Sequence, residues 1–174
     1  KMNKHNFGWY KGDTVNMGVG QGYINATPLQ LAYYSAFLAN KGRLNNFSFV
    51  QDSTDHKKDT FISENINLND WAKIHESMVG VIENPKGTAG RLRALKDYIV
   101  AAKSGTVELV STETKEDYQI IREIEGQRDH AIIIAFGPMP NPEYAVSVVI
   151  ENGESGGSVA GPVAIAVLNS LIKE

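Results

Sequence analysis

The sequence predicts an α+β domain in which helices pack on an antiparallel sheet. The order of the expected elements indicates this class: two helices come first, three strand-like segments follow, and a helix closes the chain. The chain has 174 residues, of which 42% are hydrophobic and 21% charged, as is usual for a globular domain. No internal repeat or linker divides it, so we expect one domain over residues 1–174.

The first helix is expected to follow a capping signal. The residues before it, through Tyr23, are rich in glycine and aromatic side chains and predict a loop. Thr27 suits the N-cap and Pro28 the first helical position. The segment Leu29–Asn40 is apolar nearly all round, which indicates a buried helix, and Gly42 suits its C-terminal cap.

Two more helices are expected, one in the middle of the chain and one at its end. Asn67–Asp70 opens the middle helix, which we expect to end near Ile82. Residues 43–60 before it are polar and irregular, with a short strand expected at Phe47–Val50. The apolar segment Pro162–Lys173 predicts the last helix.

Three strands are expected in the second half of the chain. The first spans residues 97–110 and opens with Asp97–Ala102, which indicates a buried strand. His130–Phe136 is almost unbroken in apolar residues, as is typical of a strand covered on both faces. Tyr144–Glu151 is the third strand. The charged residues 111–128 predict a long exposed connection between the first two.

Composition excludes several kinds of function. The net charge is −3 and no window forms a basic stripe, which argues against a nucleic-acid partner. No apolar run approaches the roughly 20 residues that cross a bilayer. The chain has no cysteine, so disulfides and thiolate metal sites are excluded, and its histidines lack the spacing of a zinc motif. We therefore expect no metal and no cofactor. The histidines are His5, His56, His75 and His130.

The most informative motif is Lys103-Ser104-Gly105-Thr106, on the first expected strand. An ammonium and two hydroxyls can hold a carboxylate, and a glycine lets another backbone come close. A Lys-Thr-Gly element is among the signatures of penicillin-binding proteins and serine β-lactamases. Taken alone, the string is a weak signal, because it can simply be a turn, and a surface lysine at a strand end is then the favoured interpretation of Lys103.

Two glycine-rich segments have plainer interpretations. Gly18–Gly22 has the look of a phosphate-binding loop, but no apolar strand precedes it, so a tight loop before the buried helix is favoured. Asn152–Gly157 is expected to be a flexible connection from strand to helix, although it could border a cleft.

Several segments around the lysine motif resemble the class B penicillin-binding proteins, most closely their elongation-transpeptidase branch, penicillin-binding protein 2. They follow one another in the order found in the family and cover nearly the whole chain. The segments are Gly12–Tyr23, Ala26–Ala32, Asn84–Ala89, Ala101–Thr106, Arg128–Ala131, Ala135–Phe136 and Val149–Gly153.

The resemblance implies a penicillin-binding/β-lactamase-like fold with a five-stranded antiparallel sheet packed by helices. Three of the five strands would lie in this chain, so residues 1–174 would form the C-terminal portion of a transpeptidase domain. The family's Ser-x-x-Lys and Ser-x-Asn motifs should precede Gly12, and they do not occur there. Ser170–Lys173 and Ser63–Asn65 imitate them, but a polar helix end and a capping or exposed segment are the favoured interpretations. We expect no nucleophile in this chain and no activity from it alone.

The resemblance also assigns roles to the motif. Lys103 and Thr106 would be catalytic: Lys103 would supply positive charge and relay protons, and the backbone N–H of Thr106 would be one oxyanion donor. Ser104, Gly105 and Thr106 would bind substrate, the two hydroxyls by holding its terminal carboxylate.

The implied reaction is peptidoglycan D,D-transpeptidation, in which stem peptides are cross-linked by acyl transfer and penicillin is bound. The implied partners are the stem peptide, β-lactams, the upstream half of the domain and membrane proteins of the elongation complex. The implied location is the periplasmic face of the inner membrane, with the anchor outside this chain. The outer edge of the strand at Tyr144–Glu151 would lack its neighbour, so we expect association through that edge or with the upstream half.

Two alternatives stay open at the level of the sequence. A β-lactamase or D,D-carboxypeptidase could use the same scaffold. A non-catalytic module could bind cell-wall peptides or morphogenesis proteins. The Gly12–Tyr23 segment and the helix start at Ala26–Ala32 favour the transpeptidase over the other enzymes.

Overall fold

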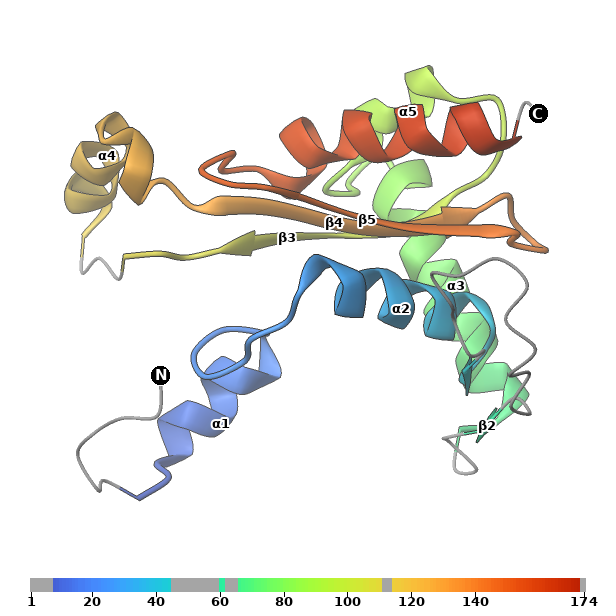
Figure 1. Ribbon diagram of the computed structural model, residues 1–174, viewed down its shortest axis with the longest axis horizontal. Helices are drawn as coiled ribbons and strands as arrows, with labels where there is room; N and C mark the ends of the chain where they lie inside the picture. The colour runs from blue at the N-terminus through green and yellow to red at the C-terminus, as the bar shows by residue number, and fades with distance from the viewer. Residues whose placement is uncertain (1–7, 45–59, 62–65, 111–113, 173–174) are drawn as a thin grey trace, which may run out of the picture.

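The fold is built on three antiparallel strands with helices on both faces (Figure 1). It is a computed structural model that describes residues 8–44, 60–61, 66–110 and 114–172. No helix within these ranges combines the length and apolarity needed to cross a membrane. The elements in chain order are α1 (Lys11–Gly18), α2 (Pro28–Ala39), β1 (Arg43–Leu44), β2 (Thr60–Phe61), α3 (Leu68–Glu83), η1 (Gly90–Leu95), β3 (Ala101–Val107), α4 (Lys115–Glu123), η2 (Glu125–Gln127), β4 (His130–Gly137), β5 (Tyr144–Ile150), the π-helical turn η3 (Gly156–Ala160) and α5 (Gly161–Ile172).

The main sheet has the strand order β3-β4-β5, with every pair antiparallel. Thr106 lies opposite Ala131, and Ala131 in turn lies opposite Ile150, so the three strands are in continuous register. Within the described residues β3 and β5 are the edges of this sheet. The expected α+β class and antiparallel sheet are therefore confirmed.

The sheet separates two apolar clusters. Successive residues of a strand point to opposite faces, so Ala102, Ile133 and Ala135 pack with the helix α5, and Ala101, Ile134 and Phe136 pack with α2 and α3. Figure 1 shows α5 on one face of the sheet and α2 on the other. This two-sided burial explains why β4 is apolar along almost its whole length.

The N-caps of the first long helices match the sequence expectations, whereas the C-cap of α2 is Asn40 and not Gly42. The Thr27 hydroxyl accepts a hydrogen bond from the Gln30 N–H at 3.2 Å, and the Gln30 side chain accepts one from the Thr27 N–H at 2.8 Å. Asn67 caps α3 by accepting from the Asp70 N–H at 3.0 Å. Gly42 has φ +84°, and a Cβ there would lie 2.5 Å from a ring carbon of Trp71.

The first correction concerns the N-terminal stretch expected to be a loop through Tyr23, because it contains α1. The Asp13 carboxylate accepts from the Tyr10 N–H at 2.9 Å, and Trp9 donates to the Thr14 hydroxyl at 2.8 Å. These local bonds satisfy the start of a helix that buries none of its residues. The glycines of this stretch favoured a loop in the sequence. The helix also lacks apolar periodicity, because none of its residues is buried.

A second correction concerns the connection 111–128, which contains the helix α4 and the turn η2. Thr114 caps α4 by accepting from the Asp117 N–H at 3.1 Å. The high charge of this segment favoured an exposed loop, although the capping residue Thr114 and the amphipathic spacing are typical of a helix.

The expected strand at 97–110 is also too long, since β3 spans only Ala101–Val107. The pairing of β3 with β4 ends at Val107, which lies opposite His130, the first residue of β4. Residues 108–110 that follow are not part of a strand. The last helix begins one residue earlier than expected, at Gly161. The expected strand at Phe47–Val50 and the string Ser63–Asn65 lie outside the described residues.

Candidate functional site

The lysine motif lies on the edge strand β3, with Lys103 and Thr106 exposed and Ser104 and Gly105 half-buried. Strand alternation directs Lys103 to the face that carries α2 and α3, and Ser104 and Thr106 to the face that carries α5. The Lys103 ammonium donates to the backbone carbonyl of Ser104. The motif therefore presents a cation and two hydroxyls along one open strand.

Thr88 completes a pair of hydroxyls beside the strand. Its Oγ1 lies 2.8 Å from the Oγ of Ser104, and either hydroxyl can donate. One proton serves the bond between the two groups, and the other can be donated to an incoming anion. The sequence indicated Thr88 only as part of the segment Asn84–Ala89 and gave it no role.

The glycine-rich loop near the N-terminus also reaches this strand. The Gln21 side chain donates to the backbone carbonyl of Thr106 at 2.9 Å, although 85 positions separate the two residues. Gly20 and Gly22 adopt φ +82° and φ +76°, which other residues rarely adopt. The loop is thus a tight turn beside the motif, in agreement with the plainer interpretation of Gly18–Gly22.

The connection after β5 packs directly on the motif strand. A Cβ at Gly156 would lie 2.1 Å from the carbonyl oxygen of Ile132 and 2.5 Å from that of Gly105. A Cβ at Gly157 would lie 2.5 Å from the carbonyl oxygen of Thr88. Both positions require glycine for this close approach. The connection, which was expected to be flexible, therefore packs tightly against β3 and Thr88.

Gly105 is different, because its own surroundings leave room. A Cβ there would meet only Ile132, at 3.7 Å and beyond, which is ordinary van der Waals contact. The described part of the chain therefore does not itself require glycine at this position.

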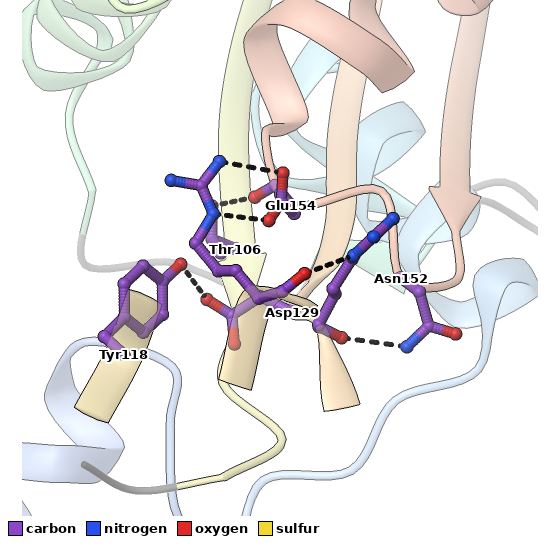
Figure 2. A network of polar contacts seen from close by, with 7 residues as sticks. Thr106, Tyr118, Asp129, Asn152 and Glu154 are labelled. Carbon is purple, nitrogen blue, oxygen red and sulfur yellow. Dashed lines mark hydrogen bonds and ion pairs between the residues drawn. The ribbon is translucent and has the colours of Figure 1, made fainter. Parts of the chain in front are cut away.

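Polar contacts hold the far end of β3 (Figure 2). The Thr106 hydroxyl donates to the backbone carbonyl of Glu154 at 3.2 Å. The Arg122 guanidinium from α4 donates to both carboxylate oxygens of Glu154, at 2.6 and 3.0 Å. This contact lowers the pKa of Glu154 and raises that of Arg122, mainly through the hydrogen bonds between them.

A second contact fixes α4 to the start of β4. The Tyr118 hydroxyl donates to the buried Asp129 carboxylate at 2.8 Å. That hydrogen bond is the first cause that raises the pKa of Tyr118, and burial and the Asp129 charge add to it. We expected residues 111–128 to be an exposed connection, and the signals of this anchored helix were the capping residue Thr114 and the amphipathic spacing that follows it.

Ser170, from the string that imitates the Ser-x-x-Lys motif, does not join this site. Ser170 lies in the second half of α5, and its hydroxyl donates to the carbonyl of Val167 at 2.7 Å. Within the described ranges, no group of three or more His, Cys, Asp or Glu side chains could hold a metal ion.

The chain is similar to a known domain family over nearly its full length. The family model described as penicillin binding protein transpeptidase domain matches residues 2–169. The peptidoglycan D,D-transpeptidase MrdA of Escherichia coli strain K12 is 34% identical over 158 residues, which cover 87% of this chain and 25% of that protein.

Solved structures agree in fold. Pseudomonas aeruginosa PBP2, solved in complex with WCK 5153, has a TM-score of 0.72 and 35% identity, over 95% of this chain and 34% of that one. PBP2 from Helicobacter pylori, solved in complex with MreC, has a TM-score of 0.76 and 29% identity, over 97% of this chain and 29% of that one. The chain thus spans about a quarter of the E. coli relative and about a third of the solved chains.

Proposed function

The chain belongs to the penicillin-binding protein transpeptidase domain family, and we propose its function on that basis. The family and the penicillin-binding/β-lactamase-like fold expected from the sequence segments are confirmed. We infer that residues 1–174 are the C-terminal portion of the domain of a peptidoglycan D,D-transpeptidase. This portion holds the terminal carboxylate of the stem peptide beside a nucleophilic serine carried by another segment.

One observation supports this function most strongly. The cation of Lys103 and the hydroxyls of Ser104 and Thr106 lie on one open strand edge. The two hydroxyls share one face of the strand and can hold a carboxylate, and the ammonium of the adjacent Lys103, on the other face, adds positive charge. An extended peptide can also add to an open edge, and a side-chain-free Gly105 lets its backbone come close.

The proposed chemistry is acyl transfer through a serine ester. The serine oxygen attacks the carbonyl carbon of the terminal D-Ala-D-Ala bond, and its proton passes to the leaving D-alanine amine. The amine of a neighbouring stem then attacks the ester and forms the cross-link, while the serine regains its proton.

In this reaction Lys103 supplies positive charge and relays the proton to the leaving group. Ser104 and Thr106 hold the terminal carboxylate, and the Thr106 N–H is one oxyanion donor. Loss of a single oxyanion donor typically costs about 10²–10³ in rate. These steps need only side-chain hydroxyls, an ammonium and backbone N–H groups, so we propose no metal and no cofactor.

The proposed partners follow from the same chemistry. β-Lactams would acylate the same serine, because they imitate the terminal dipeptide. The segment that carries the serine would be the nearest protein partner, and a membrane protein of the elongation complex would be a second, since H. pylori PBP2 was solved with MreC. We propose a location on the outer face of the cytoplasmic membrane, because peptidoglycan lies there.

Fluorescent penicillin tests this function. We expect no covalent label on the 174-residue chain alone and a label on the larger protein that also carries the serine segment. In that protein, Lys103→Ala should reduce the labelling rate by about 10²-fold or more. Lys73→Ala is the matched control, because Lys73 is exposed on α3, where it pairs with Asp70 at 3.3 Å. Equal labelling of both variants would refute the role of Lys103.

A further inference from the structure

Glu154 is held by its own backbone at the end of the motif strand. Its N–H donates to the carbonyl of Asp129 at 2.8 Å, and its carbonyl accepts from the Thr106 hydroxyl at 3.2 Å. Its φ of +62° lies in the left-handed region, where a residue other than glycine persists only if its surroundings hold it. The contacts shown in Figure 2 supply that hold.

The Glu154 side chain links this backbone to α4. Arg122 binds both carboxylate oxygens in the two-pronged geometry that fixes direction as well as distance. The backbone carbonyl of Arg122 accepts from the Arg128 guanidinium at 2.7 Å, so the end of α4 is itself fixed to the approach to β4. Glu154 therefore links α4 to strand β3 through the connection after β5.

Asn152 fixes the same connection two residues earlier. Its N–H donates to the Nδ1 of His130 at 3.0 Å, and its side chain donates to the carbonyl of Arg128 at 2.9 Å. Its φ is +57°. The position of Glu154 is thus fixed by the contacts of Asn152 before it and by its own carboxylate, which binds Arg122.

The contacts that hold Glu154 also affect Thr106, because the Thr106 hydroxyl has a single proton and donates it to the Glu154 carbonyl. In the structure that proton is directed at the Glu154 carbonyl, which fixes where the Thr106 oxygen lies. An incoming carboxylate must take the proton over, and a bond to an anion is about twice as strong as one to a neutral carbonyl. The carboxylate thus gains a hydroxyl whose oxygen is already in place.

We propose that Glu154 and Arg122 are positioning residues that set the affinity of the carboxylate subsite through Thr106. This inference rests on the proposed function of the motif. It assigns a role to the ion pair between Arg122 on α4 and Glu154 in the connection after β5. From the sequence, both segments were expected to be exposed connections.

The test uses the larger protein that carries the serine and follows its acylation by benzylpenicillin and by benzylpenicillin methyl ester. We expect Glu154→Gln to raise the apparent dissociation constant for benzylpenicillin about threefold to tenfold, with the acylation rate constant unchanged. The methyl ester lacks the carboxylate, so its constants should not change. A general loss of structure would affect both compounds.

Three further variants locate the effect. Arg122→Lys keeps the charge without the two-pronged geometry and should give an intermediate value. Glu154→Gln should have no further effect in a Thr106→Val protein, because the hydroxyl is then absent. Glu151→Gln is the control, since Glu151 is an exposed neighbouring carboxylate.

The outcomes separate the two proposals. If the unaltered protein is not acylated by benzylpenicillin, the proposed function fails. If it is acylated, and Glu154→Gln leaves both compounds unchanged, affects both equally or binds benzylpenicillin more tightly, the positioning role is overturned.

Discussion

The two ends of strand β3 are held in different ways. At Ala101 and Ala102 the strand is fully buried between α5 on one face and α2 and α3 on the other. At Thr106 it is exposed and held by hydrogen bonds to Gln21 and Glu154. The apolar end fixes the strand through area removed from water, which has no direction. The polar end fixes individual atoms, which a site for an anion requires.

The largest effect on folding is expected in the buried half. Phe136→Ala would leave a cavity beside α2 and α3 and lower the free energy of unfolding by about 3–5 kcal/mol. Val163→Ala on the exposed surface of α5 should change it by less than about 1 kcal/mol. Urea unfolding followed by circular dichroism measures both, and similar losses would contradict the proposed core.

The next effect is expected where the connection after β5 meets β3. Gly156→Ala forces a Cβ against the backbone oxygens of Ile132 and Gly105 and should cost about 1–3 kcal/mol or more. It should also slow penicillin labelling, because Gly105 must move. Gly126→Ala is the control, since no atom lies within 4 Å of a Cβ built there. A neutral Gly156→Ala would show that the connection does not pack on the strand.

A smaller effect is expected at the contact between α4 and β4. Tyr118→Phe removes the donor to Asp129, which is 5% exposed, and leaves that carboxylate without its hydroxyl partner. We expect a loss of about 1–2 kcal/mol in the free energy of unfolding. Tyr10→Phe on the exposed N-terminal segment serves as the control. Equal melting temperatures for the two variants would refute the anchoring of α4.

Much of the buried half could be predicted from the sequence, and much of the polar half could not. The unbroken apolar run of β4 and the Thr27-Pro28 cap are local signals, and both led to the correct elements. The contacts of Gln21 with Thr106, and of Arg122 with Glu154, join residues 85 and 32 positions apart. No local pattern marks such pairs. Gly156 likewise looked like a flexible connection, because its close approach to Gly105 exists only in the folded chain.

The smallest effect is a pH dependence at the polar end. Folding lowers the pKa of the Glu154 carboxyl below its ordinary value of 4.5, chiefly through the Arg122 hydrogen bonds. A group whose pKa is lowered on folding stabilises the fold above its unfolded pKa, and this contribution is lost as pH falls through the folded value. The difference in melting temperature between the unaltered chain and Glu154→Gln should therefore persist at neutral pH. It should shrink only below about pH 4.5, and a difference independent of pH would exclude the ion pair.

The central claim is that this chain provides the carboxylate-binding edge of a transpeptidase cleft whose nucleophile lies in another segment. Peptide mapping by mass spectrometry of the penicillin-treated larger protein tests it most directly. We predict a single penicilloyl group on a serine outside these 174 residues, formed about 10²-fold more slowly in the Lys103→Ala variant. A penicilloyl group on a serine within this chain, Ser170 included, would contradict the claim.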